Sequence, residues 1–127
     1  MTQSEIILKV HQFSFEMFQK EYIAKIEFSD KMTSFIMAKC GTYKDDQGNI
    51  QLYGIRFSNR LITENWDIDI DYIVKHELIH WYTNIEQNVF CGHNKAFKAN
   101  CKKFNVRRQF ISNIDFTGIE WQTVCLN

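Results

Sequence analysis

His76, Glu77 and His80 form an H-E-x-x-H pattern, and their residue types and spacing can do chemistry. In a helix, positions four apart lie about 40° apart in projection and about 6 Å apart along the axis, so both imidazoles can reach one point. Two imidazoles at that spacing suit Zn²⁺, and a carboxylate beside them can act on a water next to the metal. The pattern therefore predicts a zinc-dependent hydrolase, and specifically a peptidase, with Glu77 as its general base.

The third ligand of such a site can come from two positions. His93 follows the pair, and with it three of the four histidines of the chain fall within eighteen residues. Glu86 stands ten residues after His76, where the pattern H-E-x-x-H-x-x-G-x-x-H carries its third ligand. That pattern needs a glycine turn where this chain has Thr83. If the helix instead continues, Glu86 lies about 9 Å beyond His80 along the axis. The sequence favours His93 and keeps Glu86 as the alternative.

Two predicted helices position these side chains. The first spans about residues 67–87, with acidic residues in its first turn and an apolar stripe at helical spacing. The histidines lie away from that stripe, so we expect them to face a cleft while the stripe faces the core. The second helix spans about residues 93–104, with His93 on its apolar face and lysines on the opposite face. The stripe of the first helix consists of Ile70, Val74, Leu78, Trp81 and Ile85.

An N-terminal helix is predicted before these two. Ile6 and Val10 begin a stripe of apolar residues at helical spacing, which indicates a helix at about residues 4–19. Thr2 is suited to cap its first turn, because a threonine side chain accepts a hydrogen bond from a backbone N–H there. His11 lies off the stripe, so we expect it in solvent and not in a metal site.

Between the helices, apolar and polar residues alternate with a period of two, which indicates strands. A turn cluster at residues 45–49 separates the last two strands. The parity of the apolar residues changes within the last strand, which predicts a bulge near Tyr53 and Gly54. We therefore expect an α+β fold with a small, three-stranded, mostly antiparallel sheet. The predicted strands span about residues 22–28, 35–43 and 50–58.

Composition limits the class of protein. The 127 residues suffice for one compact domain but not for two. Hydrophobic residues make up 45% and aromatic residues 15% of the chain, which excludes a disordered protein. No apolar run approaches the roughly 18 residues of a membrane span, and the N-terminus has no signal-peptide pattern. We expect a single cytoplasmic domain over residues 1–127 without a membrane partner. Reduced thiols are expected at Cys40, Cys91, Cys101 and Cys125.

The net charge is zero, but the charges are unevenly spread. Residues 1–86 carry nine basic and thirteen acidic side chains, whereas residues 87–114 carry six basic side chains and no acid. Such a segment is either the solvated back of a helix or a surface that contacts nucleic acid. No aromatic residues interleave with its lysines to stack bases, which favours the solvated helix. A DNA contact would depend on Lys95, Lys98, Lys102 and Lys103.

Two segments together resemble the SprT-like zinc metallopeptidase family, of the SprT and Spartan protease-domain type. They are His76-Glu77-Leu78-Ile79-His80 and Gly92-His93-Asn94-Lys95-Ala96-Phe97-Lys98. Residues 39–43 and 55–58 resemble two strand motifs of that family. The resemblance covers about residues 4–105 and leaves 106–127 as an extension of unassigned structure. This chain lacks the paired cysteines of the C-terminal zinc ribbon that many members carry, so a DNA-repair role is carried over only weakly.

The resemblance implies a zincin-like α+β fold with zinc on His76, His80 and His93 and Glu77 as catalytic base. The predicted function is zinc-dependent hydrolysis of a protein or peptide substrate. We expect that substrate to lie extended along an exposed sheet edge at about residues 50–58. Two alternatives stay open, namely a zinc-bearing DNA-associated or regulatory binding module with little hydrolytic activity, and a purely structural zinc site. The sequence does not choose an oxyanion donor among Tyr43, Tyr53, Tyr72 and Tyr82.

Overall fold

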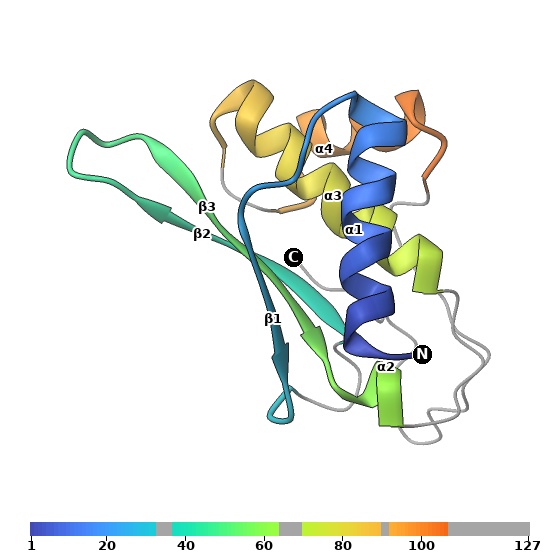
Figure 1. Ribbon diagram of the computed structural model, residues 1–127. Helices are drawn as coiled ribbons and strands as arrows, with labels where there is room; N and C mark the ends of the chain where they lie inside the picture. The colour runs from blue at the N-terminus through green and yellow to red at the C-terminus, as the bar shows by residue number, and fades with distance from the viewer. Residues whose placement is uncertain (33–36, 64–69, 90–91, 107–127) are drawn as a thin grey trace, which may run out of the picture.

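The computed structural model of the chain describes residues 1–32, 37–63, 70–89 and 92–106 (Figure 1). Along the chain, the described residues form one helix, then three consecutive strands, then three helices, in the order α1, β1, β2, β3, α2, α3, α4. The protein is thus an α+β protein with one three-stranded sheet, as expected. The predicted first turn of the metal-site helix, with Asp67 and Asp69, lies outside the described residues, as do Cys91 and residues 107–127.

Helix α1 spans Gln3–Phe18, which confirms the predicted N-terminal helix. Thr2 caps it, because its side-chain oxygen accepts a hydrogen bond from the backbone N–H of Glu5. The helix ends at Gln19, whose left-handed conformation (φ 55°) turns the chain toward the sheet. Ile6 and Val10 are fully buried, so the apolar stripe faces the core as predicted.

The sheet consists of β1 (Lys25–Ser29), β2 (Ala38–Lys44) and β3 (Ile50–Ser58), in the spatial order β1-β3-β2. β2 and β3 are antiparallel and joined by a turn at residues 45–49, in which Gly48 has a positive φ of 82°. β1 pairs with β3 in parallel, so the sheet is mixed and the prediction of a mostly antiparallel sheet is wrong for β1. The hairpin partner β2 already occupies one edge of β3, which leaves the opposite edge for β1.

A bulge lies in β3 where the parity change predicted it. Gly54 pairs with Gly41, but the next pair along the ladder is Leu52 with Thr42, so Tyr53 is the extra residue. After the bulge, Ile55 and Phe57 point into the core. The bulge therefore lets both halves of β3 turn their apolar residues inward. It also sets Tyr53 on the outer face of the sheet, where the side chain is 45% exposed.

A short helix, α2 (Arg60–Thr63), follows β3 and was not predicted. Helix α3 spans Ile70–Gln87 and packs against α1, β2, β3 and the last helix. In its apolar stripe Val74, Leu78 and Trp81 are buried, as expected. Ile85 is 47% exposed, so the stripe ends before the last turn, where Ile85 lines a surface pocket instead.

Helix α4 spans Lys95–Lys103 and begins two residues later than predicted. The reason is local, because the Asn94 side chain accepts a hydrogen bond from the Phe97 backbone N–H at 2.8 Å and so caps the helix. Phe97 and Cys101 are buried, and the lysines of the opposite face are exposed, as the sequence predicted. No helix among the described residues is long and apolar enough to cross a membrane.

The cysteines differ from the prediction of reduced thiols. Cys40, in β2, is disulfide-bonded, so that prediction is wrong for this residue. Cys101 carries a thiol that is not part of a disulfide, with 1% exposure, and packs in the hydrophobic core between α4 and the rest of the domain. Its burial agrees with the ordinary behaviour of a cysteine thiol as a small apolar side chain.

Candidate metal centre

Helix α3 places His76 and His80 one turn apart on the same face, with their ring centroids 5.0 Å apart. Both rings are buried, each with 1% exposure, and so is Glu77 between them, with none. Three polar side chains in the middle of a helix are thus withdrawn from water. Burial of polar side chains costs free energy unless partners compensate it, so such a group marks a site and not ordinary packing.

His93 completes the group from the segment just before α4. Its Nε2 atom lies 3.2 Å from Nε2 of His76, and its ring centroid is 5.2 Å from that of His80. The nearest ligand atoms of the three histidines all lie within 4.8 Å of one another. The prediction that His93 points inward, toward the pair on the preceding helix, is therefore confirmed by the geometry.

His80 shows why these rings suit a metal ion. Burial, and then the neighbouring His76 and His93, lower the pKa of His80 to about 2, so its imidazole is neutral at physiological pH. Both of its ring nitrogens are buried and have no hydrogen-bond partner among the described residues. A neutral imidazole with an uncompensated buried nitrogen is a ligand for a divalent transition metal. The residues present therefore fit a metal ion.

Phe97 packs against all three histidines and fixes the planes of their rings. It stacks on His80 at a centroid distance of 4.1 Å and on His93 at 4.7 Å, and it meets His76 edge to face at 5.2 Å. Its side chain is fully buried. Because Phe97 comes from the first turn of α4, the same helix that follows His93 also supplies the apolar wall of the site.

The chain between α3 and α4 must return to bring His93 beside His76. Asn88 ends α3 in a left-handed conformation (φ 54°), and its side chain accepts a hydrogen bond from the Ile50 backbone N–H of β3 at 2.9 Å. Asn84 donates to the Val89 carbonyl at 2.7 Å. These positioning residues were not predicted, although asparagine is a common residue just after the C-terminal end of a helix, where Asn88 lies.

Glu86, the alternative third ligand, does not join the histidines. Helix α3 continues past Thr83 to Gln87, so the turn that would bring Glu86 back is missing. Glu86 is exposed, and Tyr82 and the Asn100 side chain, the latter at 3.4 Å, form hydrogen bonds to it that hold the pKa of its carboxyl below the usual value. His93, and not Glu86, therefore lies beside His76 and His80, because a helix and not a turn follows His80.

The tyrosines that were considered as oxyanion donors are distributed over the molecule. The Tyr53 hydroxyl donates to Glu27 on the outer face of the sheet, and the Tyr82 hydroxyl bonds to Glu86 in the last turn of α3. Tyr43 is 51% exposed at the end of β2. None of these three is in ring contact with the histidines.

An H-E-x-x-H helix that meets a third inward histidine from the segment before the next helix is typical of a metalloprotease-like domain. The family model that matches this chain agrees with that class, since the SprT-like family model covers residues 4–120. The chain therefore belongs to the SprT-like family. No curated protein and no solved structure matches it significantly.

Proposed function

We propose that the protein is a zinc-dependent metallopeptidase with a zincin-like fold, in which His76, His80 and His93 hold the zinc ion. The observation that carries this proposal is the convergence of three imidazoles on one point, two of them buried and that of His93 half-buried, with the buried Glu77 on the same helix as the first two. Histidine nitrogens are preferred zinc ligands, and three protein ligands leave a fourth position of the tetrahedral ion open, as in catalytic zinc sites.

When bound, zinc supplies a Lewis acid that polarises the scissile carbonyl and lowers the pKa of water toward about 7. Glu77 acts as general base and takes the proton of the attacking water. It then transfers this proton to the leaving amine, so that the peptide bond breaks into a carboxylate and an amine with no net gain or loss of protons at the enzyme. The fully buried position of Glu77 supports this role, because a carboxylate shielded from bulk water exchanges protons with the substrate and not with solvent.

The peptide substrate would add to an edge of the sheet by backbone hydrogen bonds. The expected edge, residues 50–58, is wrong, because β3 is the central strand and is paired on both sides. Of the two edge strands, β2 packs against the metal-site helix α3, whereas β1 does not pack against α3 to a similar extent. The edge of β2 is therefore the one we assign to the substrate.

The test is the substitution Glu77→Gln in the zinc-loaded protein, measured on a library of quenched fluorescent peptides. We expect folding and zinc content to stay unchanged and the turnover rate to fall by about 10²- to 10⁴-fold, since a general base contributes that much. Glu86→Gln, an exposed glutamate nine residues further along the same helix, is the matched control and should retain full activity. A Glu77→Gln protein as active as the control would refute the proposed mechanism.

A second candidate function is a zinc-bearing binding module that contacts DNA. It is favoured by the basic face of α4, whose four lysines are exposed and lack an acidic neighbour in the sequence from 87 to 114. Salt-sensitive binding of single-stranded DNA that survives Glu77→Gln would support it. Reversal of charge at Lys98, Lys102 and Lys103 should abolish such binding. The same reversal at Lys20, Lys31 and Lys44, which are also exposed, is the control.

A further inference from the structure

Two rows of residues cross the outer face of the sheet, opposite to α3. In the first row Glu27 of β1, Arg56 of β3 and Lys39 of β2 are register partners. In the second row, Lys25, Gly54 and Gly41 are partners, so two adjacent positions have no side chain. A pocket of about 340 Å³ lies over these glycines, with Tyr53 beside it. A pocket of this size is at the lower end for small-molecule sites.

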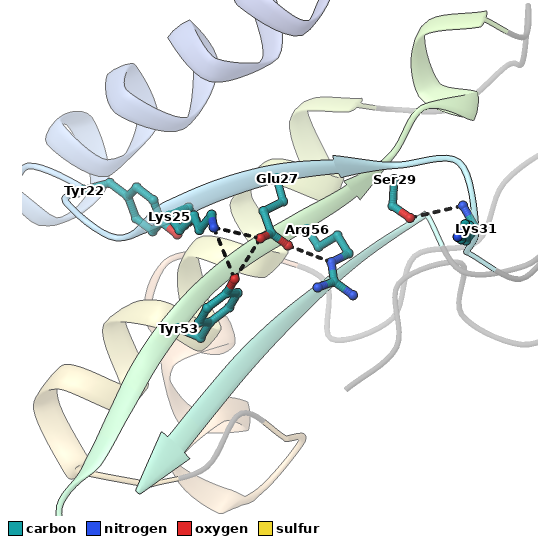
Figure 2. Close-up of polar contacts among 7 residues, drawn as sticks. All are labelled: Tyr22, Lys25, Glu27, Ser29, Lys31, Tyr53 and Arg56. Atoms are coloured by element: carbon teal, nitrogen blue, oxygen red, sulfur yellow. Dashed lines mark hydrogen bonds and ion pairs between the residues drawn. The ribbon is translucent and has the colours of Figure 1, made fainter. Parts of the chain in front are cut away.

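The charges around the pocket are strongly unbalanced. Glu27 accepts hydrogen bonds from the Tyr53 hydroxyl (2.8 Å) and from Nε of Arg56 (2.9 Å), and the Lys25 ammonium lies 3.2 Å from it (Figure 2). These contacts satisfy the carboxylate from three sides. Lys25 and Arg56 contact this one anion, and Lys39 lies on the far side of Arg56, so across the two rows three positive charges minus one negative charge leave a net charge of +2.

Lys39 and Arg56 place two of the positive charges next to each other beside the pocket. They stand directly opposite each other on β2 and β3, an arrangement of like charges that destabilises a sheet. Arg56 uses Nε for Glu27, and its two terminal nitrogens point away from that carboxylate (Figure 2). Lys39 is exposed and has no ionic partner among the described residues. An anion placed between the two side chains would relieve their repulsion.

Gly41 and Gly54 differ in whether the surrounding structure leaves room for a side chain. A Cβ atom at Gly54 would lie 2.3 Å from the Lys25 carbonyl oxygen, so the close approach of β1 explains this glycine. A Cβ atom at Gly41 would meet only Tyr53 Cβ, at an ordinary 3.9 Å, so packing does not require glycine there. The absence of a side chain at Gly41 instead keeps the pocket open. The bulge at Tyr53 supplies the wall.

We propose that this pocket is a second binding site, for an oxyanion, either carboxylate or phosphate, carried on a flat apolar group. The oxyanion would pair with Lys39 and with the terminal nitrogens of Arg56, and the apolar group would lie over Gly41 against the Tyr53 ring. Arginine and lysine are suited to this, because hydrogen bonds between charged groups are about twice as strong as neutral ones. The site is separate from the histidines and does not depend on zinc.

The experiment titrates the full chain with benzoate, phenyl phosphate and the neutral analogue benzamide, and follows the amide signals of Gly41 and Gly54 by ¹H–¹⁵N NMR at low salt. We expect saturable shifts with at least one of the two anions and none with benzamide. The preferred anion then tells whether the natural ligand carries a carboxylate or a phosphate. Lys39→Gln should weaken binding about tenfold, the effect of one lost charge-assisted hydrogen bond. Lys44→Gln, at the exposed end of the same strand, should leave binding unchanged.

A further variant fills the pocket without a change of charge. Gly41→Ile places a β-branched side chain in the open space and should abolish anion binding in a protein whose far-ultraviolet circular dichroism is unchanged. If this variant does not fold, Lys39→Gln alone decides. Equal affinities of Lys39→Gln and Lys44→Gln, or no saturable shift at either glycine with both anions, would overturn the proposal.

Discussion

Asn100 donates a hydrogen bond from Nδ2 to Oγ1 of Thr83 over 3.0 Å, and both side chains are buried. The two residues are 17 positions apart, the same separation as His76 and His93, whose Nε2 atoms lie 3.2 Å apart. The contacts between α3 and the α4 segment thus repeat after seven residues, or about two helical turns. Both contacts hold the α4 segment against α3, and the Thr83–Asn100 contact helps to set the distance at which His93 meets its partners.

Asn100→Ala is predicted to destabilise the protein and to weaken metal binding. The substitution leaves the Thr83 hydroxyl buried without its donor, which costs about 1–3 kcal/mol of unfolding free energy. Because α4 is then held less firmly, zinc affinity should fall by about 10- to 100-fold, as for other residues that orient metal ligands. Urea denaturation and competition with a zinc chelator measure the two effects. Lys98→Ala, on the exposed face of α4, should change stability by less than about 0.5 kcal/mol.

His93→Ala is predicted to remove zinc from the protein. Purified wild-type chain should contain one equivalent of zinc by elemental analysis, and the variant should lose it, since two histidines are left of three. The control is His11→Ala, which removes the exposed histidine of α1 and should leave the zinc content at one equivalent. Equal zinc content in the two variants would show that the ion does not depend on His93.

Removal of the metal is predicted to lower thermal stability only when all three histidines are present. A ligand that binds the folded state stabilises it by RT ln(1 + [L]/Kd), which is about 2.7 kcal/mol at a hundredfold excess over Kd. Addition of a chelator should therefore reduce the Tm of the wild-type protein by several degrees. The same addition should leave the Tm of His93→Ala unchanged. A chelator effect of the same size in both proteins would place the ion elsewhere.

Gly54→Ala is predicted to destabilise the sheet. Its Cβ atom would lie 2.3 Å from the Lys25 carbonyl oxygen, so β1 must move away from β3. Overpacking of this kind costs about 1–3 kcal/mol of unfolding free energy, measurable by urea denaturation. Gly41→Ala, at the neighbouring position on β2, has room for its methyl group and should be neutral or stabilising by about 0.5–1 kcal/mol. Similar losses in both variants would contradict the close approach at Gly54.

Glu27 is predicted to stay ionised far into the acid range. Hydrogen bonds from Tyr53 first, and then from Arg56 and Lys25, lower its pKa from 4.5 to about 2. A carboxyl whose pKa is lowered by folding stabilises the protein above its unfolded pKa and loses this contribution as the pH falls toward the folded value. The attachment of β1 to β3 should therefore weaken between about pH 4.5 and pH 2.

Tyr53→Phe tests this cause, because it removes the largest contribution to the lowered pKa of Glu27. The pKa of the Glu27 carboxyl, followed by ¹³C NMR, should rise toward 4.5 in the variant. Tyr43→Phe, which changes another exposed tyrosine outside the Glu27 contacts, should leave that pKa where it is in the wild type. If Glu27 titrates at the same pH in both variants, the hydrogen bond from the Tyr53 hydroxyl does not cause the lowered pKa of Glu27.

Much of the architecture follows from local patterns in the sequence. The periods of 3.6 and 2 predicted α1 and the bounds of β3, and the parity change predicted the bulge at Tyr53. The spacing of His76 and His80 fixed their common face, because four residues make about one helical turn. These features depend on which face of an element is buried, and the order of apolar residues records that directly.

Only the tertiary structure decided which elements lie side by side. The parallel pairing of β1 with β3, the choice of His93 over Glu86, and the row of Glu27, Arg56 and Lys39 all join residues far apart in the chain. A sequence pattern reports that a side chain faces inward or outward but not which neighbour it meets there. That neighbour depends on the packing of whole helices and strands, which is settled by the balance of burial and hydrogen bonding over the entire domain.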